Sequence, residues 1–286
     1  MPLTAAKEWP LIAFTLVSQI AVGAFWTLAA AHFFIRGGRA AGSFAAASER
    51  GLAAVAALLI VAAAFSFFHL GRPGRAGFAL ANLRRSWLSR EVFFEVFFLA
   101  MVAFLALFSR GSAGRANLLD GAYIFASVLG VFFLGSMAGI YMLRTVPNWR
   151  GPHTALSFFL SAAVLGPLAT AAGRGYLFAF PAPAFGNAVL ASVLGAIALI
   201  IVTVLLFSPK TGFLGTKKNT FFEFPVRRMY PFLVFRFLFL AAAVLLIVMY
   251  LEVGRDLLLV LAFVSVLTAE TLGRYLFYAA YGRVGV

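Results

Sequence analysis

Long apolar blocks alternate with short polar segments along the whole chain. An α-helix needs about 20 apolar residues to cross about 30 Å of hydrocarbon, because it rises about 1.5 Å per residue. Eight blocks reach this length, and each is predicted to be a membrane-spanning helix. Their approximate limits are residues 10–35, 52–70, 91–109, 119–143, 154–172, 185–208, 231–252 and 257–279.

The connections between these blocks are too short to form an extramembrane domain. We therefore interpret residues 1–286 as a single integral membrane domain of the all-α class. The prediction is a polytopic protein with eight transmembrane helices, for which a pair of four-helix bundles is one possible arrangement. Whatever this chain does must take place in the bilayer or at its surface.

Composition agrees with this pattern and narrows the function. The chain is 63% hydrophobic and 11% charged, whereas a soluble domain carries about a quarter charged residues. It contains 23 Lys and Arg against 9 Asp and Glu, a formal charge of +14. These charges lie between apolar blocks, which is typical of loops that bind lipid phosphate or an acidic partner. A nucleic-acid partner is not expected.

Eight spans would place both chain ends on one side of the membrane, which we call face A. The face A segments are the amino-terminal segment, residues 71–90, 144–153 and 209–230, and the carboxyl-terminal end. They carry about twice as many Lys and Arg as the opposite segments. The positive-inside tendency therefore favours face A in the cytoplasm. Much of the excess lies in residues 71–90, and without them the bias is small.

Residues 68–95 differ from every other connection, with the sequence FHLGRPGRAGFALANLRRSWLSREVFFE. His69 ends the second predicted span, Glu91 begins the third, and arginines lie between them. Ser89 is placed to cap the third helix. Ionisable groups at membrane depth are costly and often mark proton or substrate routes. The convergence of an imidazole, a carboxylate and several cations predicts a functional site here.

Each of these residues also has a plainer interpretation. His69 alone is as often an interfacial residue, and Glu91 alone commonly stabilises a helix dipole. Glu95 lies one turn after Glu91 on the same helix face, where two carboxylates would repel and suit proton acceptance. Pairing of Glu95 with an arginine on another helix is equally compatible. Glu270 and Arg274 are four residues apart and favour a structural ion pair.

Arg236 lies inside a span and needs a buried partner, which the sequence does not identify.

Several cofactor classes are excluded or disfavoured. The chain has no cysteine, so it forms no disulfide and holds no iron–sulfur cluster through thiolates. Its histidines are too few and too scattered for a bis-histidine haem or a zinc site, and no metal site is predicted. The three are His32, His69 and His153.

Motifs in matching order along nearly the whole chain resemble the membrane-anchor subunits of the dimethyl sulfoxide reductase family of molybdenum enzyme complexes. That family is related to the polysulfide reductase membrane subunits. The matching residues are Glu8-Trp9-Pro10-Leu11 with Gln19; His69-Leu70-Gly71 with Pro73, Arg75-Ala76 and Ala79-Leu80; Leu88-Ser89-Arg90-Glu91; Tyr141 with Thr145-Val146-Pro147 and Trp149; Gly166-Pro167; and Glu270-Thr271-Leu272-Gly273-Arg274 with Phe277-Tyr278.

The resemblance implies an eight-helix anchor that oxidises menaquinol or another quinol and carries neither haem nor iron–sulfur cluster. Its implied partners are a four-cluster ferredoxin-like iron–sulfur subunit and a molybdopterin catalytic subunit, in a bacterial or archaeal cytoplasmic membrane. The family's quinol site falls on His69 and Glu91. The weaker quinol-binding candidates are Gln19, Gly71, Arg75, Ser89 and Glu95, and the docking candidates on face A are Arg72, Arg84, Arg85, Arg144 and Trp149.

Three other functions are compatible with the pattern. One is a purely structural anchor, and another is an anchor that passes electrons from its partners to a quinone. A small-solute or ion transporter ranks last, because Gly- or Pro-broken spans do not occur at corresponding positions of the two halves. The sequence leaves open the terminal substrate, the quinone type and the side of the membrane on which the catalytic subunits lie.

Overall fold

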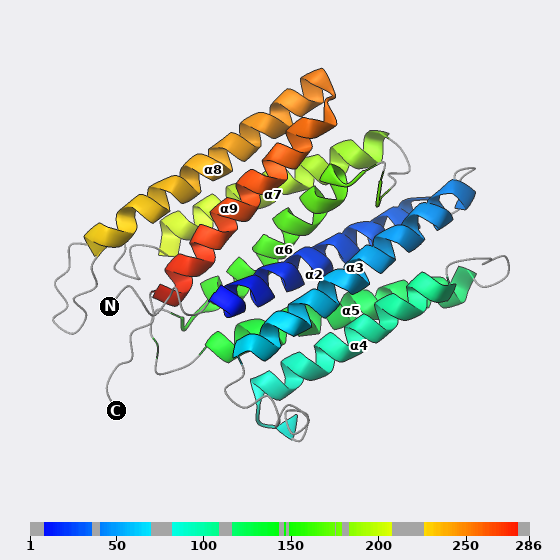
Figure 1. The fold of residues 1–286 in the computed structure, drawn as a ribbon, viewed down its shortest axis with the longest axis horizontal. Coiled ribbons are helices and arrows are strands. Elements are labelled where there is room, and N and C mark those ends of the chain that lie inside the picture. Colours follow the sequence, from blue (N-terminus) through cyan, green and yellow to red (C-terminus); the bar gives the residue numbers. More distant parts are fainter. Residues whose placement is uncertain are drawn as a thin grey trace.

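The computed structural model describes residues 9–35, 41–69, 82–108, 116–142, 146, 149–174, 176–178, 183–207 and 226–279. Within these ranges the chain forms eight α-helices and no β-strand (Figure 1). They are α2 (Trp9–Ile35), α3 (Ala41–His69), α4 (Trp87–Phe108), α5 (Ala116–Tyr141), α6 (Pro152–Ala172), α7 (Pro183–Phe207), α8 (Val226–Val253) and α9 (Asp256–Ala279).

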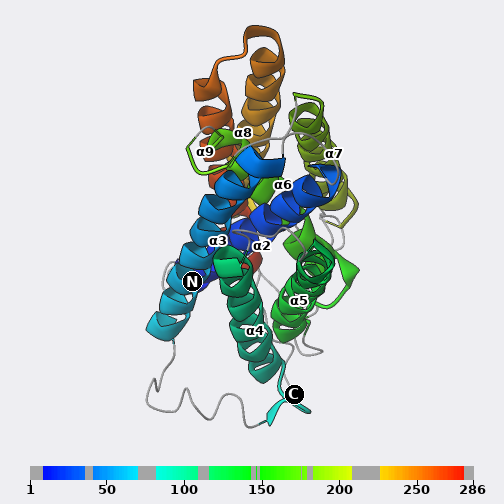
Figure 2. The same cartoon turned by 90° about the vertical axis from the view of Figure 1, so that its right-hand side faces the viewer.

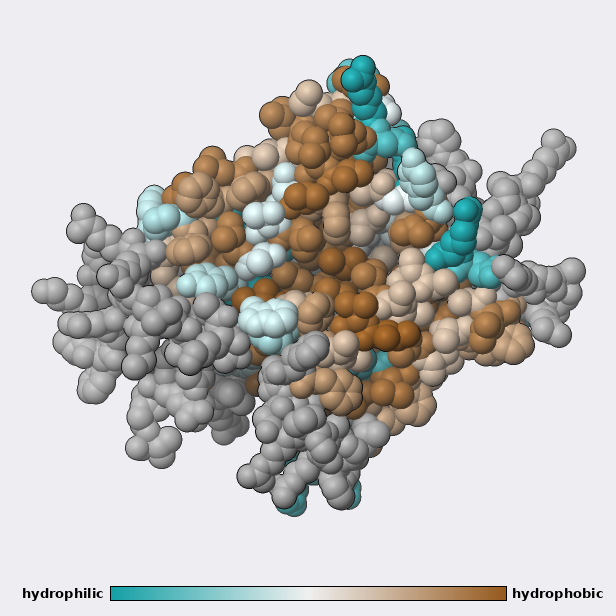
Figure 3. Space-filling model, viewed as in Figure 1, coloured by the Kyte–Doolittle hydropathy of each residue, from teal (hydrophilic) through white to brown (hydrophobic). Residues whose placement is uncertain are grey.

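All eight of these helices are long and apolar enough to cross a membrane. This confirms the predicted all-α polytopic class. Apolar side chains cover the middle of the face seen in Figure 3, as a belt in contact with lipid requires. The first helix, α2, is by contrast largely enclosed by other helices.

Two helices begin at least five residues earlier than the hydrophobic pattern predicted. The second begins at Ala41 rather than near residue 52, and the seventh begins at Val226 rather than near residue 231. The run Ala45–Ala47 consists of the strongest helix former, so the helix continues beyond the apolar block. Hydropathy identifies the part of a helix that lies in lipid, whereas high helix propensity extends the helix beyond that part.

The helices form two groups of four. Within α2–α5 and within α6–α9, neighbours in sequence pack together and the first helix packs against the last. The two groups meet mainly through α2 and α6 (Figure 2). The described helices therefore adopt the paired four-helix arrangement.

Two glycines let α2 and α6 cross with their backbones in contact. A Cβ atom added to Gly23 would lie 2.0 Å from the carbonyl oxygen of Ala162, and one added to Gly166 would lie 2.1 Å from the carbonyl carbon of Gly23. Small residues allow this close approach in membranes, where dispersion and polar contacts replace the hydrophobic effect. The contact between the two halves therefore depends on the absence of side chains at Gly23 and Gly166.

Consecutive helices run in opposite directions. The helices α2, α4, α6 and α8 begin at one end of the molecule, where α3, α5, α7 and α9 end (Figure 1). This end corresponds to the predicted face A. The start of α4 is consequently brought to the same level as the ends of α5 and α9.

Candidate functional site

Two buried carboxylates lie one turn apart near the start of α4. Glu91 is 5% exposed and Glu95 is 7% exposed. Oxygen Oε1 of Glu95 has no hydrogen-bond partner among the described residues, and no ion pair to this side chain is found there. The alternative in which Glu95 pairs with an arginine of another helix is therefore not seen in the described part of the chain.

The residue that caps α4 is Ser86, not Ser89. The hydroxyl oxygen of Ser86 accepts a hydrogen bond from the backbone N–H of Ser89 at 3.2 Å, and the helix begins at Trp87. The predicted cap was wrong because the helix starts earlier than the apolar block. Ser89 instead lies in the first turn with its side chain buried, on the same side of the membrane as Glu91.

Replacing Ser86 with alanine should lower the free energy of unfolding by about 1 kcal/mol, because one backbone N–H at the start of α4 loses its acceptor. The measurement is thermal unfolding in detergent. Ser265 provides a matched control, since it is exposed and bonds only within its own helix. Equal unfolding temperatures for Ser86→Ala and Ser265→Ala would contradict the cap assignment.

Arg90 fixes the turn that precedes α4. Its guanidinium donates to the backbone oxygens of Leu83 and Arg84 at 2.9 Å and 2.8 Å, and it lies over the ring of Trp87. The side chains of Arg84 and Arg85 are exposed at the surface. They are accessible, as a docking role requires, and that role stays a prediction.

Polar atoms of α2 lie at the same level as the two glutamates. The rings of Phe25 and Phe98 pack edge to face at 5.2 Å, and α2 and α4 run in the same direction. Ser18 precedes Phe25 by seven residues on α2, and Glu91 precedes Phe98 by seven residues on α4. Seven residues make about two helical turns, so Ser18 and Glu91 lie on the same helix faces as the two rings and nearer to face A. The residue next to Ser18 is Gln19, a predicted quinol-binding candidate, and it is fully buried.

These α2 side chains have unused hydrogen-bonding capacity. The hydroxyl of Ser18 and both side-chain polar atoms of Gln19 are buried without a hydrogen-bond partner among the described residues. Buried polar groups normally have partners, because leaving one unpaired costs about 1–3 kcal/mol. These atoms and Oε1 of Glu95 therefore have the capacity to form hydrogen bonds with a polar ligand.

Two tyrosines complete this end of the bundle. The hydroxyl of Tyr278 on α9 donates to the hydroxyl of Tyr141 on α5 at 3.1 Å, and both side chains are buried. The sequence motifs contained both tyrosines, but nothing in their spacing indicated that residues 137 positions apart would meet.

Trp149 is buried rather than exposed, and its predicted role in docking stays a prediction. Its ring is 7% exposed and stacks on Phe277 at 5.1 Å. Its indole N–H donates to the backbone oxygen of Phe277 at 2.8 Å. A tryptophan in a short connection is typical of an interfacial residue. Here its contacts with Phe277 hold the segment before α6 against the end of α9.

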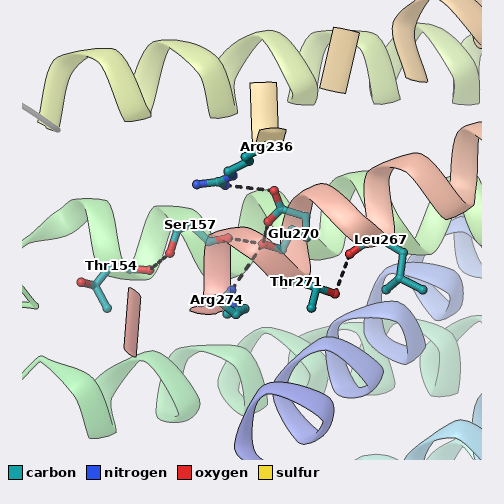
Figure 4. Close-up of polar contacts among 8 residues, drawn as sticks. Thr154, Ser157, Arg236, Leu267, Glu270, Thr271 and Arg274 are labelled. Carbon is teal, nitrogen blue, oxygen red and sulfur yellow. Dashed lines mark hydrogen bonds and ion pairs between the residues drawn. The ribbon is translucent and has the colours of Figure 1, made fainter. Parts of the chain in front are cut away.

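A buried ion network lies beyond the tyrosines. Arg236 on α8 forms an ion pair with Glu270 on α9 at 3.0 Å. The hydroxyl of Ser161 on α6 donates to the other oxygen of Glu270 at 2.5 Å and accepts from Arg274 at 3.3 Å. Figure 4 shows the two arginines on opposite sides of Glu270. The network therefore joins α6, α8 and α9.

The expected direct pair between Glu270 and Arg274 is thus replaced by a pair across helices. Arg236 occupies the space above Gly273, where an added Cβ atom would lie 2.7 Å from its guanidinium carbon. Arg274 lies instead over the ring of Phe158, with its guanidinium carbon 3.7 Å from the ring centroid. Residues on one helix cannot reveal that a neighbouring helix brings a second arginine to the same carboxylate.

A second ionisable pair lies near the opposite end of the bundle. Nε2 of His32 on α2 lies 2.8 Å from a carboxylate oxygen of Asp120 on α5, and the imidazole stacks on Tyr123 at 4.2 Å. On α2, His32 lies about four turns after Ser18, so the pair belongs to a different level of the membrane from the glutamates. The sequence placed His32 near this end but did not predict its carboxylate partner.

Several predicted site residues lie outside the described residues. They are Gly71, Arg72, Arg75 and Arg144, and also the side chain of His69, whose backbone ends α3. The described polar residues at this end of the bundle include Ser18, Gln19, Ser89, Glu91 and Glu95. Of these, the pattern did not single out Ser18, since a serine in an apolar helix carries no distinguishing signal.

Residues 3–280 match the family described as DMSO reductase anchor subunit (DmsC). The protein is similar to YnfH of Escherichia coli K12, an anaerobic dimethyl sulfoxide reductase chain, with 33% identity over 58% of this protein and 57% of that one. It is also similar to a second anaerobic dimethyl sulfoxide reductase chain of the same organism, with 33% identity over 56% and 55% of the two proteins.

A third relative is a sulfite dehydrogenase subunit of Allochromatium vinosum, which is 33% identical over 42% of this protein and 40% of that one. The matched segments thus span a little over half the length of the two reductase proteins and less than half of the sulfite dehydrogenase subunit.

Proposed function

Because the chain belongs to the family of DMSO reductase anchor subunits, a multi-pass membrane family, we propose that it binds a quinol beside Glu91 and oxidises it. The electrons pass one at a time to an iron–sulfur subunit docked on face A, and from there to a molybdopterin catalytic subunit. Menaquinol is the quinol we favour, and the membrane is the cytoplasmic membrane of a prokaryote. The termini are assigned to the cytoplasm from the charge distribution.

The observation that supports this proposal is the set of buried polar atoms on α2 and α4 that have no hydrogen-bond partner among the described residues, one of which is an oxygen of Glu95. Oxidation of one quinol releases two electrons and two protons, so its site needs hydrogen bonds at the ring oxygens and an acceptor for protons. Ser18 and Gln19 supply hydrogen-bonding atoms inside the membrane, and Glu91 or Glu95 supplies the acceptor. Buried polar atoms with no role in binding would be expected to have hydrogen-bond partners within the protein.

In this proposal Glu91 takes a proton from a quinol hydroxyl and passes it to water at face A before it accepts the second. His69, at the end of α3, contacts the quinol and Ser89 lines the site. The exposed Arg84 and Arg85 attract an acidic surface of the iron–sulfur subunit. Gly71, Arg72, Arg75 and Arg144 belong to the same proposal as binding or docking residues.

The test uses the purified complex with its partner subunits and the variant Glu91→Gln, which removes the charge and keeps the shape. Quinol-supported turnover should fall by about 10²-fold or more, the usual contribution of a positioned proton acceptor. Reduced viologen, which donates directly to the partner subunits, should still support full turnover. Glu252→Gln is the control, because Glu252 is exposed near the opposite end of α8.

Unchanged quinol turnover in Glu91→Gln would reject the proposal and favour a purely structural anchor. A further check is the affinity of a quinone-analogue inhibitor for the complex, which a structural anchor would not bind.

The reverse direction is the second candidate, and the relative named as a sulfite dehydrogenase subunit favours it. A dehydrogenase delivers electrons to its membrane subunit, so the same site would then reduce a quinone. Initial rates in the two directions, measured with quinol and with quinone on one preparation, decide between them.

A further inference from the structure

Trp87, the first residue of α4, is held in a fixed position although much of it stays exposed. Its ring packs against Gly139 of α5, where an added Cβ atom would lie 2.6 Å from the ring carbon Cδ2. The guanidinium carbon of Arg90 lies 4.4 Å from the ring centroid. The residue is nevertheless 45% exposed. A fixed and exposed aromatic side chain can bind a partner at little cost in conformational entropy.

The turn before α4 places positive charge beside this ring. Arg84 and Arg85 are exposed, and the hydrogen bonds from Arg90 to the backbone oxygens of Leu83 and Arg84 hold the turn in place. The sequence contains no Asp or Glu between residues 71 and 90. The surface around Trp87 is therefore complementary to an acidic partner.

Exposed apolar side chains outside the membrane-spanning segments lie near the ring. Leu83 is 37% exposed and precedes the span that begins at Trp87, and Met142 is 45% exposed and follows the span that ends at Tyr141. Met142 comes three residues after Gly139, so it lies on the same side of α5 and nearer to face A. Tryptophan, methionine and arginine are enriched in protein interfaces. Their combination here favours a protein partner over lipid.

The position of Trp87 also suits the binding of an electron acceptor. Glu91 follows Trp87 by one helical turn, which is about 6 Å along the helix axis. Electron transfer slows steeply with distance. A subunit that takes electrons from a quinol beside Glu91 must therefore bind at the part of face A nearest to Glu91, and Trp87 lies there.

We propose that Trp87 is the central contact of a docking surface for an acidic face of the iron–sulfur subunit. The docking surface consists of Leu83, Arg84, Arg85, Trp87 and Met142. Trp87 and the two apolar side chains contact the middle of the interface, and the two arginines bind carboxylates of the partner around it. This inference rests on the proposed function, and it adds the residues that hold the partner.

The test measures how fast the partner subunits leave the purified complex, with this chain immobilised through a tag. Trp87→Ala should increase the release rate by about tenfold or more, the usual effect of removing a tryptophan from the centre of an interface. Trp9→Ala is the matched control. Trp9 is 55% exposed, packs edge to face on Phe65 and begins α2 at the same end of the molecule (Figure 1), and its removal should leave the release rate unchanged.

A second variant moves the ring without removing it. Gly139→Ala places a Cβ atom where the ring of Trp87 now lies, so the ring must shift and the release rate should rise several-fold. Gly135→Ala is the control on the same helix, because nothing lies within 4 Å of its added Cβ atom. It should have no effect on release.

The arginines are tested by the double variant Arg84→Gln with Arg85→Gln, which changes only exposed side chains. Its association rate with the separated partner subunits should fall at low salt, and the difference from the native chain should disappear at high salt. An association rate equal to the native one at low salt would contradict the charge complementarity.

Equal release rates for Trp87→Ala and Trp9→Ala would overturn the inference and place the Trp87 ring among lipid head groups. The inference and the proposed function fail in different ways. Native release from Trp87→Ala, together with lost quinol turnover in Glu91→Gln, rejects only the docking surface. Full quinol turnover in Glu91→Gln, together with fast release from Trp87→Ala, rejects quinol oxidation beside Glu91 and leaves the docking surface standing.

Discussion

Leucine in place of Gly166 should prevent the two halves of the protein from packing together. The added side chain would meet the backbone of Gly23, which the first added carbon already approaches to 2.1 Å. Backbone atoms cannot rotate away as a side chain does. Overpacking of a core usually costs about 1–3 kcal/mol, and the cost rises when the obstacle is another backbone. Little folded protein should be recovered from membranes.

The control for this prediction is Gly135→Leu. Gly135 also lies inside a helix, but nothing lies within 4 Å of the position that its Cβ atom would take. The substitution should be neutral or slightly stabilising, because glycine costs a helix about 1 kcal/mol relative to better helix formers. Recovery is measured as the monodisperse fraction in size-exclusion chromatography. Equal recovery of the two leucine variants would show that the α2 and α6 backbones do not depend on this contact.

The variant Glu270→Gln should be the most damaging single removal of charge. It would leave Arg236 and Arg274 buried without a counter-charge, and breaking a buried pair typically costs about 3–5 kcal/mol. The loss should be seen as a lower unfolding temperature in detergent. Glu252→Gln changes charge equally at an exposed position and should have an effect below about 0.5 kcal/mol.

A compensating variant separates charge from shape. Arg236→Gln combined with Glu270→Gln removes one charge of each sign and leaves the network with the same net charge as the native protein. It should recover at least half of the stability that Glu270→Gln loses, because desolvation of both charges is avoided. A double variant as unstable as the single one would mean that the geometry of Glu270, and not its charge, holds α8 and α9 to α6.

Much of the candidate site could be predicted from the local sequence pattern. A carboxylate at the start of an apolar block, followed by another one turn later, indicated that Glu91 and Glu95 share a helix face, and both are buried. The glutamates were visible because ionisable residues are rare inside apolar segments. Ser18 carried no such signal, since serine is common in membrane helices and its burial depends on the neighbouring helix.

The sequence by itself determined the number of spans, their order and alternation, and the helix faces on which charged residues lie, because hydrophobic length and helical periodicity are local properties. The tertiary structure decided which helices meet. Contacts between α8 and α9, and between α5 and α9, gave Arg236 its carboxylate and Tyr141 its hydroxyl partner. In a membrane the hydrophobic effect does not distinguish one helix pairing from another. The pairing is determined by close backbone contacts and by the few polar groups that can pair inside the membrane. Both depend on residues far apart in sequence.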